Sequence, residues 1–96
     1  MALFVVRHQH EADRCPAKNP QMGAMLLLHL SEPNARQHGI RIHGEGVLDG
    51  QHTLYLILEA ADRSQVEAYM KPFAQAGSVE VWPASRCETV VSRQSC

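Results

Sequence analysis

The chain alternates between apolar runs and polar loops, and the spacing of its apolar positions predicts its secondary structure. Residues 2–10 are apolar through Val6 and then turn polar, which predicts a strand whose first half is buried on both faces at the centre of a sheet. Residues 52–60 (HTLYLILEA) form the clearest strand, with leucine at every second position. Weaker strands are predicted at residues 40–48, which contain two glycines, and at residues 78–82, which Pro83 closes.

Apolar residues at helical spacing predict three helical segments between these strands. The first runs over residues 20–30, with Asn19 as its N-cap, and we expect its wide apolar stripe to be buried over more than one face. A proline break leads into a short helical piece at residues 33–38. The last helix occupies residues 62–76, where Asp62 and the glutamine three residues later can form a capping box.

The predicted elements follow the order β-α-β-β-α-β, which is the split βαβ arrangement of ferredoxin-like α+β folds. This order predicts a four-stranded antiparallel sheet, in the order 4-1-3-2, with both helices on one face. Asp49-Gly50 predicts a type I′ hairpin between the second and third strands. We expect a single α+β domain over residues 1–96, in which residues 83–96 form a C-terminal extension with a short ordered piece at residues 88–91.

Composition narrows the classes of function. The chain has 96 residues and a net charge of −1, so it offers no electrostatic basis for binding nucleic acid or an anionic membrane. No apolar run reaches the roughly 18 residues of a membrane span, and the first residues lack the features of a secretory signal. We therefore expect a cytoplasmic protein, in which the three cysteines are free thiols rather than a disulfide framework.

Several stretches of the chain resemble the dimeric α+β barrel superfamily, and in particular its small stand-alone bacterial members. The resemblance is carried by LFVVRHQH, HTLYLILEA, DRSQVEAYMKPFAQAG and SVEVWP, spread over residues 1–91. It implies a homodimer in which two sheets pack face to face, with a pocket for a small-molecule ligand between sheet and helices. The superfamily includes small monooxygenases, muconolactone isomerase and haem-degrading enzymes. The sequence matches the catalytic residues of none of them.

The end of the first predicted strand carries the strongest candidate for chemistry. His8 and His10 share one face of that strand, because side chains in a strand alternate with a period of two. In the predicted sheet His52 begins the neighbouring strand close to His10, and the loop carrying Cys15 leaves from the same edge. Imidazoles and a thiolate suit Zn, Cu or Ni, and an open coordination position would activate water. The alternative is a group of polar residues that bond to backbone and solvent.

Other histidines have simpler interpretations beside their functional ones. His29 lies on the apolar stripe of the first helix, where it is either a hydrogen-bonded core residue or a proton shuttle that lines a pocket. His43 lies between glycines on the weak strand with Glu45 on the same face, where the pair meets either a ligand or solvent. His38 lies in the last turn of a helix, whose dipole favours a cation there.

The remaining charged and sulfur-containing residues suggest structural roles. Arg7 points away from His8, and we expect it to pair with Glu59 or Glu80. Cys87 follows the fourth strand, at the end of the sheet opposite to His10. A disulfide between Cys87 and Cys15 is therefore not expected within one chain.

Three functions are compatible with these patterns. The first is a dimeric barrel protein that binds a transition metal through His8 and His10, helped by His52 or Cys15. The second is a cofactor-free monooxygenase or isomerase that acts on a small ring compound, with His29, His43 or His8 transferring the proton. The third is a non-catalytic dimer that binds a small molecule or a protein. These possibilities depend on which face of the first strand packs against the helices, because that face decides whether His8 and His10 point into a pocket or onto a subunit interface.

Overall fold

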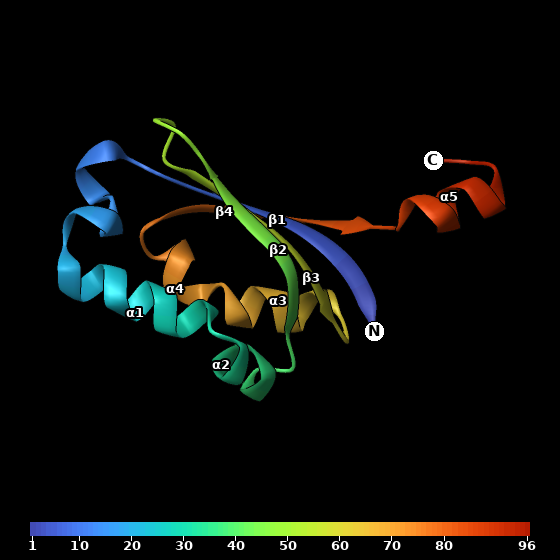
Figure 1. Ribbon diagram of the computed structural model, residues 1–96, viewed down its shortest axis with the longest axis horizontal. Coiled ribbons are helices and arrows are strands. Elements are labelled where there is room, and N and C mark those ends of the chain that lie inside the picture. Colours follow the sequence, from blue (N-terminus) through green and yellow to red (C-terminus); the bar gives the residue numbers. More distant parts are fainter.

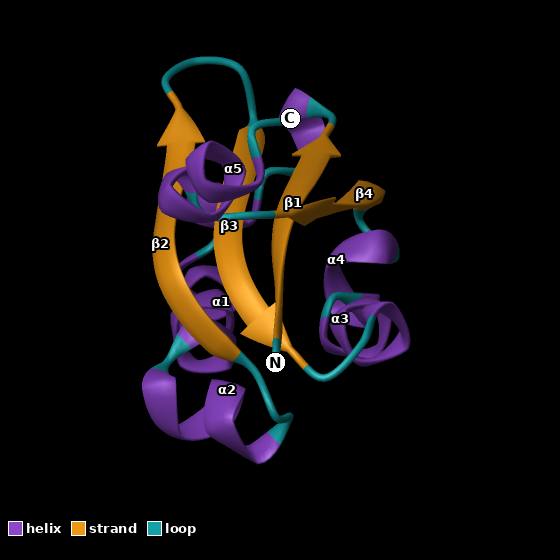
Figure 2. Cartoon of the chain, turned by 90° about the vertical axis from the view of Figure 1, so that its right-hand side faces the viewer, coloured by secondary structure: helices purple, strands orange, loops and turns teal.

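Four antiparallel strands form one sheet in the computed structural model, which describes residues 1–96 (Figures 1 and 2). Their order is β2-β3-β1-β4, which is the predicted order 4-1-3-2 read from the other edge of the sheet. The long apolar strand β1 therefore lies in the interior, as its composition predicts. The strands are β1 (Ala2–His10), β2 (Arg41–Leu48), β3 (Thr53–Ala60) and β4 (Gly77–Ala84).

Helices cover one face of the sheet, as predicted for this α+β fold, and a further helix lies beyond its end (Figure 1). The covering helices are α1 (Pro20–Leu30), α2 (Glu32–Gln37), α3 (Arg63–Tyr69) and α4 (Lys71–Ala74). Helix α5 (Cys87–Arg93) extends away from the sheet, and two 3-10 turns, η1 (Ala12–Arg14) and η2 (Pro16–Lys18), connect β1 to α1. None of these helices is long and apolar enough to cross a membrane.

The hydrophobic core lies between the sheet and helices α3 and α4. In β1 the side chains of Phe4, Val6 and His8 are buried, and each is opposite a buried leucine of β3. Helix α3 adds Val66 and Tyr69, which are both fully buried. Strand β1 therefore turns the face that carries its histidines toward the helices, which places the histidines beside the interior of the protein.

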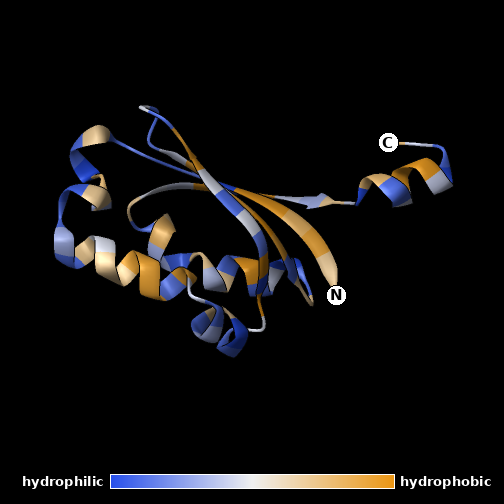
Figure 3. Ribbon diagram, in the orientation of Figure 1, coloured by the Kyte–Doolittle hydropathy of each residue, from blue (hydrophilic) through white to orange (hydrophobic).

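Helix α1 differs from the prediction, because none of its residues is buried. Leu26 and Leu30 pack partly against the core, but Met25, Leu27 and Leu28 are 67%, 71% and 69% exposed. Figure 3 shows hydrophobic residues of this helix in orange. The expectation of a helix buried over more than one face is wrong. Helices α3 and α4 pack directly on the sheet, whereas α1 reaches the core only through Leu26 and Leu30, so much of its apolar surface lies in solvent.

Strand β4 and the hairpin between β2 and β3 also correct the predicted boundaries. Strand β4 continues through Pro83, because it is an edge strand and a proline there can direct its missing N–H toward solvent. The hairpin loop has four residues, 49–52, instead of a two-residue type I′ turn. In this loop the left-handed backbone conformation occurs at Gly50 (φ 73°) and His52 (φ 51°), and not at Asp49.

The last two helical regions are longer or more divided than predicted. The helix expected at residues 62–76 is divided at Met70 into α3 and α4, since Pro72 lies in the first turn of the second piece. Asp62 caps α3 as predicted, by accepting a hydrogen bond of 3.0 Å from the backbone N–H of Gln65. The short piece expected at residues 88–91 is the longer helix α5.

The sheet face opposite the helices is apolar at its centre. Val5 of β1 lies between Ile57 of β3 and Trp82 of β4 in the register of the strands, and Ile57 and Trp82 are 45% and 41% exposed. Arg7 pairs with Glu80 on this face, which is one of the two partners predicted for it. No part of the chain covers these side chains, so the sheet presents an open apolar surface to solvent.

Candidate metal centre

Antiparallel pairing brings the end of β1 next to the loop that begins β3. Gln9 of β1 is opposite Thr53, and the backbone N–H of His10 donates a hydrogen bond of 3.2 Å to the carbonyl of His52. The chain after β1 then turns through η1 and η2, with Cys15 between the two turns. His10, Cys15 and His52 therefore arrive at one corner of the sheet from three separate segments.

These three side chains have the arrangement of a possible metal site. One potential ligand atom from each of His10, Cys15 and His52 lies within 4.8 Å of the other two, and each residue is half-buried. The rings of His10 and His52 meet edge to face, with centroids 5.2 Å apart. Zinc holds nitrogen at about 2.0–2.1 Å and sulfur at about 2.3 Å, so side-chain rotations that draw the three atoms closer together would let them share one ion. The structure thus groups three of the four residues predicted from the sequence.

His52 enters this group through a backbone conformation that few side chains adopt. Its φ of 51° lies in the left-handed region, where histidine occurs more often than most residues other than glycine. Such a conformation costs on the order of 1–3 kcal/mol and is concentrated at functional sites. It directs the His52 ring back toward His10 at the start of β3.

The fourth predicted ligand, His8, lies behind His10 and not beside the other three. Its Nδ1 lies 3.1 Å from the carbonyl oxygen of Ser78, and its Nε2 lies 3.2 Å from the Nδ1 of His10. A carbonyl can only accept, so Nδ1 of His8 carries the proton and Nε2 of His8 must be an acceptor. His10 then donates from its own Nδ1, which leaves its Nε2 unprotonated.

That Nε2 atom of His10 is buried and has no hydrogen-bond partner. A buried polar atom without a partner is uncommon, because leaving it unpaired costs about 1–3 kcal/mol. The hydrogen-bonded chain from Ser78 through His8 to His10 therefore presents a free nitrogen lone pair at the corner where Cys15 and His52 lie. Metal-binding histidines are oriented by this kind of support on the second ring nitrogen.

Burial controls the protonation of the two β1 histidines. It lowers the pKa of His8, and the nearby His10 lowers it further, against the raising effect of the Ser78 carbonyl. Burial also lowers the pKa of His10, with a smaller contribution from the charge of His52. Both rings are therefore neutral at neutral pH, and neutral imidazole is the form that binds metals.

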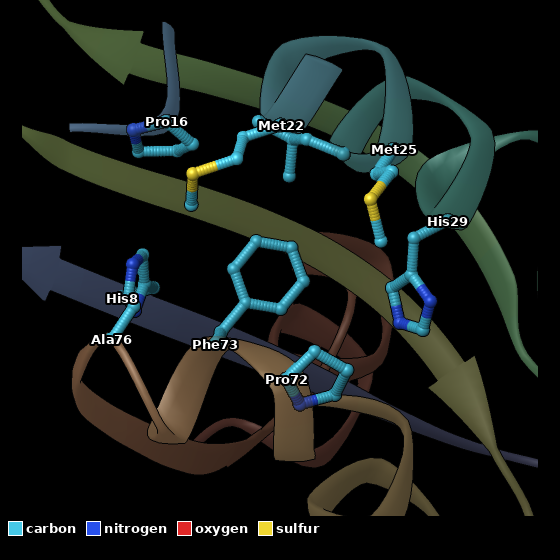
Figure 4. A pocket seen from close by; sticks show the side chains of 9 residues that line it. His8, Pro16, Met22, Met25, His29, Pro72, Phe73 and Ala76 are labelled. Atoms are coloured by element: carbon cyan, nitrogen blue, oxygen red, sulfur yellow. The ribbon is translucent and has the colours of Figure 1, made fainter. Parts of the chain in front are cut away.

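Two apolar cavities lie next to these residues, beneath helix α1. The larger has a volume of about 350 Å³, and its walls include His8 and all three members of the group. The smaller, of about 230 Å³, lies between α1 and α4, and the side chains of Met22, Met25 and Phe73 converge on it (Figure 4). The two cavities share part of their walls, which consists of His8, Pro16, Leu26 and Phe73.

The other candidate histidines are engaged elsewhere. His29 stacks on Tyr69 with ring centroids 4.5 Å apart, its Nε2 donates to the Tyr69 carbonyl at 2.8 Å, and its Nδ1 lies 3.3 Å from the Asn34 amide nitrogen. His43 pairs with Glu59 at 3.3 Å. His29 lines the smaller cavity, whereas neither residue belongs to the group at the end of β1.

The remaining cysteines lie far from the group. Cys87 and Cys96 are exposed free thiols, and Cys87 begins α5 beyond the end of the sheet opposite to η1 and η2 (Figure 1). Sequence reasoning missed the carbonyl of Ser78, because a backbone carbonyl leaves no signal in the residue type that carries it. The resemblance implies a pocket between sheet and helices, but the residues that line it depend on where α1 lies.

Comparison with known proteins adds a family but no activity. The family model described as a domain of unknown function (DUF3303) matches residues 2–95. This range includes the whole sheet, all the helices and every residue of the group. A search of curated proteins finds no match.

Proposed function

The chain belongs to the DUF3303 family, and we propose that it binds one transition-metal ion, Zn, Cu or Ni, through His10, Cys15 and His52. The ligand atoms would be Nε2 of His10, the thiolate of Cys15 and a ring nitrogen of His52. His8 has a supporting role in this proposal, because it holds the ring of His10 instead of binding the ion. The protein would act as a homodimer.

The observation that carries the proposal is the unpaired Nε2 of His10. This atom is buried without a hydrogen-bond partner, although the other nitrogen of the same ring is held by His8. His10 belongs to a group whose other members are a second imidazole and a thiol. Binding a metal would pair this nitrogen, which no protein donor pairs in the fold.

The ligand set also favours this class of metals. Thiolate and imidazole ligands suit Zn and Cu, and imidazole also suits Ni, whereas Ca and Mg require oxygen ligands. Three protein ligands leave a fourth position of a tetrahedral ion open, which distinguishes a catalytic or ligand-binding site from a closed structural one. At such a position the ion would lower the pKa of a bound water or accept an external ligand.

The proton-transfer alternative has weaker support in the geometry. A general base needs a nitrogen with a free lone pair within reach of a substrate. Both nitrogens of His29 have partners, and Nε2 of His43 lies 3.3 Å from the Glu59 carboxylate. The group at the end of β1 is the place where a histidine nitrogen is both buried and unpaired.

The dimer is supported by the open face of the sheet. Val5, Ile57 and Trp82 form an apolar centre on that face, and the pair between Arg7 and Glu80 lies beside it. A second copy that packs the same face against it would remove these side chains from water. Helix α5, which projects from the sheet with Val91 exposed, would then have a neighbouring surface to contact.

Metal analysis of protein without a histidine tag tests the proposal. We expect the purified or reloaded protein to hold one ion per chain, and His10→Ala and Cys15→Ser to lose it. Cobalt is a useful substitute, because a Co–thiolate bond gives an absorption band that reports Cys15 directly.

Two variants serve as matched controls for this measurement. Cys87→Ser removes an exposed thiol far from the group, and His38→Ala removes a histidine outside it. Both should retain the ion. An unmodified protein that binds no metal when supplied with Zn, Cu, Ni or Co would disprove the proposal, as would full binding by His10→Ala together with Cys15→Ser.

A further inference from the structure

The larger cavity adjoins the metal group, and its lining indicates what an ion there would bind. His10, Cys15 and His52 each form part of its wall. Most of the remaining wall is apolar, and includes Leu26, Leu30, Val47, Leu54 and Phe73. A ligand on the open position of the ion would therefore extend into an apolar space.

The size of the cavity sets the size of that ligand. Its volume is about 350 Å³, within the roughly 300–1,000 Å³ range of small-molecule sites in proteins. An engineered cavity of about 150 Å³ holds benzene. The space beneath α1 therefore accommodates one aromatic ring or a short branched hydrocarbon together with a small head group.

The charge of the site selects the head group. A divalent ion bound by one thiolate and two neutral imidazoles retains one positive charge, and an apolar cavity is a poor environment for an uncompensated charge. A head group with one negative charge makes the complex neutral. Glu45 and Asp49 also line the cavity, but both are exposed, so water and salt screen their repulsion of an anion.

We infer that the metal group and the larger cavity together form a binding site for a small monoanion with a compact hydrocarbon body, such as an aromatic carboxylate or thiolate. The head would bind the ion at its open position, and the body would lie among Leu26, Leu54 and Phe73. This inference rests on the proposed metal site. It adds to that proposal the class of ligand that the metal would bind, and it identifies the cavity as the binding site for the hydrocarbon body of this ligand.

Binding of three probes to the Co-loaded protein tests this inference. Phenylacetate and acetate share a carboxylate but differ in the body, and 2-phenylacetamide has the same body without the charge. We expect phenylacetate to perturb the cobalt spectrum with a Kd at least about tenfold lower than that of acetate, which corresponds to about 1.4 kcal/mol. The amide should bind more weakly than phenylacetate by a similar factor.

A variant that fills the cavity tests the contribution of the cavity wall to ligand binding separately from that of the metal. Val47 is 62% exposed on edge strand β2, so Val47→Trp should fold and place an indole in the cavity. It should weaken phenylacetate binding at least about tenfold and leave acetate binding unchanged. Val91→Trp is the matched control, because Val91 is 73% exposed on α5, outside the cavity.

The outcomes distinguish this inference from the metal proposal. Failure of cobalt to bind would overturn both. Cobalt binding with equal affinity for acetate and phenylacetate would overturn the ligand class alone, because the hydrocarbon body would then gain nothing from the cavity. Equal effects of Val47→Trp and Val91→Trp on phenylacetate binding would also overturn it.

Discussion

His8 and His10 are joined by a hydrogen bond of 3.2 Å between Nε2 of His8 and Nδ1 of His10, and this contact fixes which nitrogen His10 can offer to a metal. The direction of the bond follows from the other side of His8, where Nδ1 donates to the carbonyl of Ser78 at 3.1 Å. A pair that resembles two ligands in the sequence is therefore one candidate ligand and its support. The two roles predict different results when each residue is replaced.

Replacing His8 should weaken metal binding without abolishing it. His8→Phe removes the acceptor for His10 Nδ1, and the loss of such support lowers metal affinity by about 10–100-fold. His8→Gln should recover part of the loss, since its amide can donate to Ser78 and accept from His10. Competition titrations with a zinc chelator measure the affinities, and thermal unfolding checks the fold. A loss as complete as that of His10→Ala would show that His8 is itself a ligand.

A charge at the centre of the open sheet face should prevent dimerisation. Ile57 is 45% exposed opposite Val5, so Ile57→Glu places a carboxylate where two copies would meet. Light scattering after size-exclusion chromatography should give twice the chain mass of 10.7 kDa for the unmodified protein and 10.7 kDa for Ile57→Glu. Leu28→Glu, on an exposed position of α1, is the control and should remain dimeric. A monomeric unmodified protein would contradict the prediction.

The order of the strands could be predicted from the sequence because it follows from the β-α-β-β-α-β succession of elements, each of which has a local pattern. The alternating leucines identify β3 as a strand, and Asn19 and Asp62 mark the starts of α1 and α3. The burial of helix α1 could not be predicted from its local pattern. Its stripe predicts burial, but the core against the sheet is formed largely by residues of α3 and α4 that are distant in the sequence, and α1 reaches it only through Leu26 and Leu30.

The candidate site also has features that the sequence predicts and features that it does not. The shared corner of His10, Cys15 and His52 follows from antiparallel pairing and could be predicted. The supporting role of His8 depends on the backbone carbonyl of Ser78 in β4, which no residue type encodes. The left-handed backbone of His52 is also absent from the prediction, because the Asp49-Gly50 pair indicates a shorter turn than the four-residue loop that forms.

Stability should fall in alkaline solution through Tyr69. Burial raises the pKa of Tyr69 to about 12, with a further contribution from Glu45, and its hydroxyl donates to the His29 carbonyl at 2.8 Å. The unfolded chain releases this proton near pH 10, whereas the folded protein keeps it, so the stabilisation is complete below pH 10 and is lost progressively up to about pH 12. The loss over this range should be on the order of 3 kcal/mol.

Two variants isolate this effect in urea unfolding at several pH values. Tyr69→Phe should cost about 1 kcal/mol at pH 7, because the hydrogen bond to His29 is lost, and should remove much of the decline above pH 10. Tyr55→Phe replaces the other tyrosine of the chain, on the open sheet face, and should keep the decline. Parallel alkaline profiles for Tyr69→Phe and the unmodified protein would contradict the assignment.

A methyl group at Gly77 should destabilise both the sheet and the metal group. Gly77 is opposite His10, and a Cβ there would clash with the carbonyl oxygen of Gln9 and lie 2.9 Å from its carbonyl carbon and 3.0 Å from Cα of His10. These are backbone atoms, so β1 and β4 must separate, and we expect Gly77→Ala to lower the free energy of unfolding by about 2–3 kcal/mol and to weaken metal binding. Gly44→Ala, in the same sheet with no atom within 4 Å of the added carbon, should change stability by no more than about 0.5 kcal/mol. Urea unfolding measures the free energy of unfolding of both variants. Equal decreases in the two would show that the close approach of β4 to β1 does not require glycine at position 77.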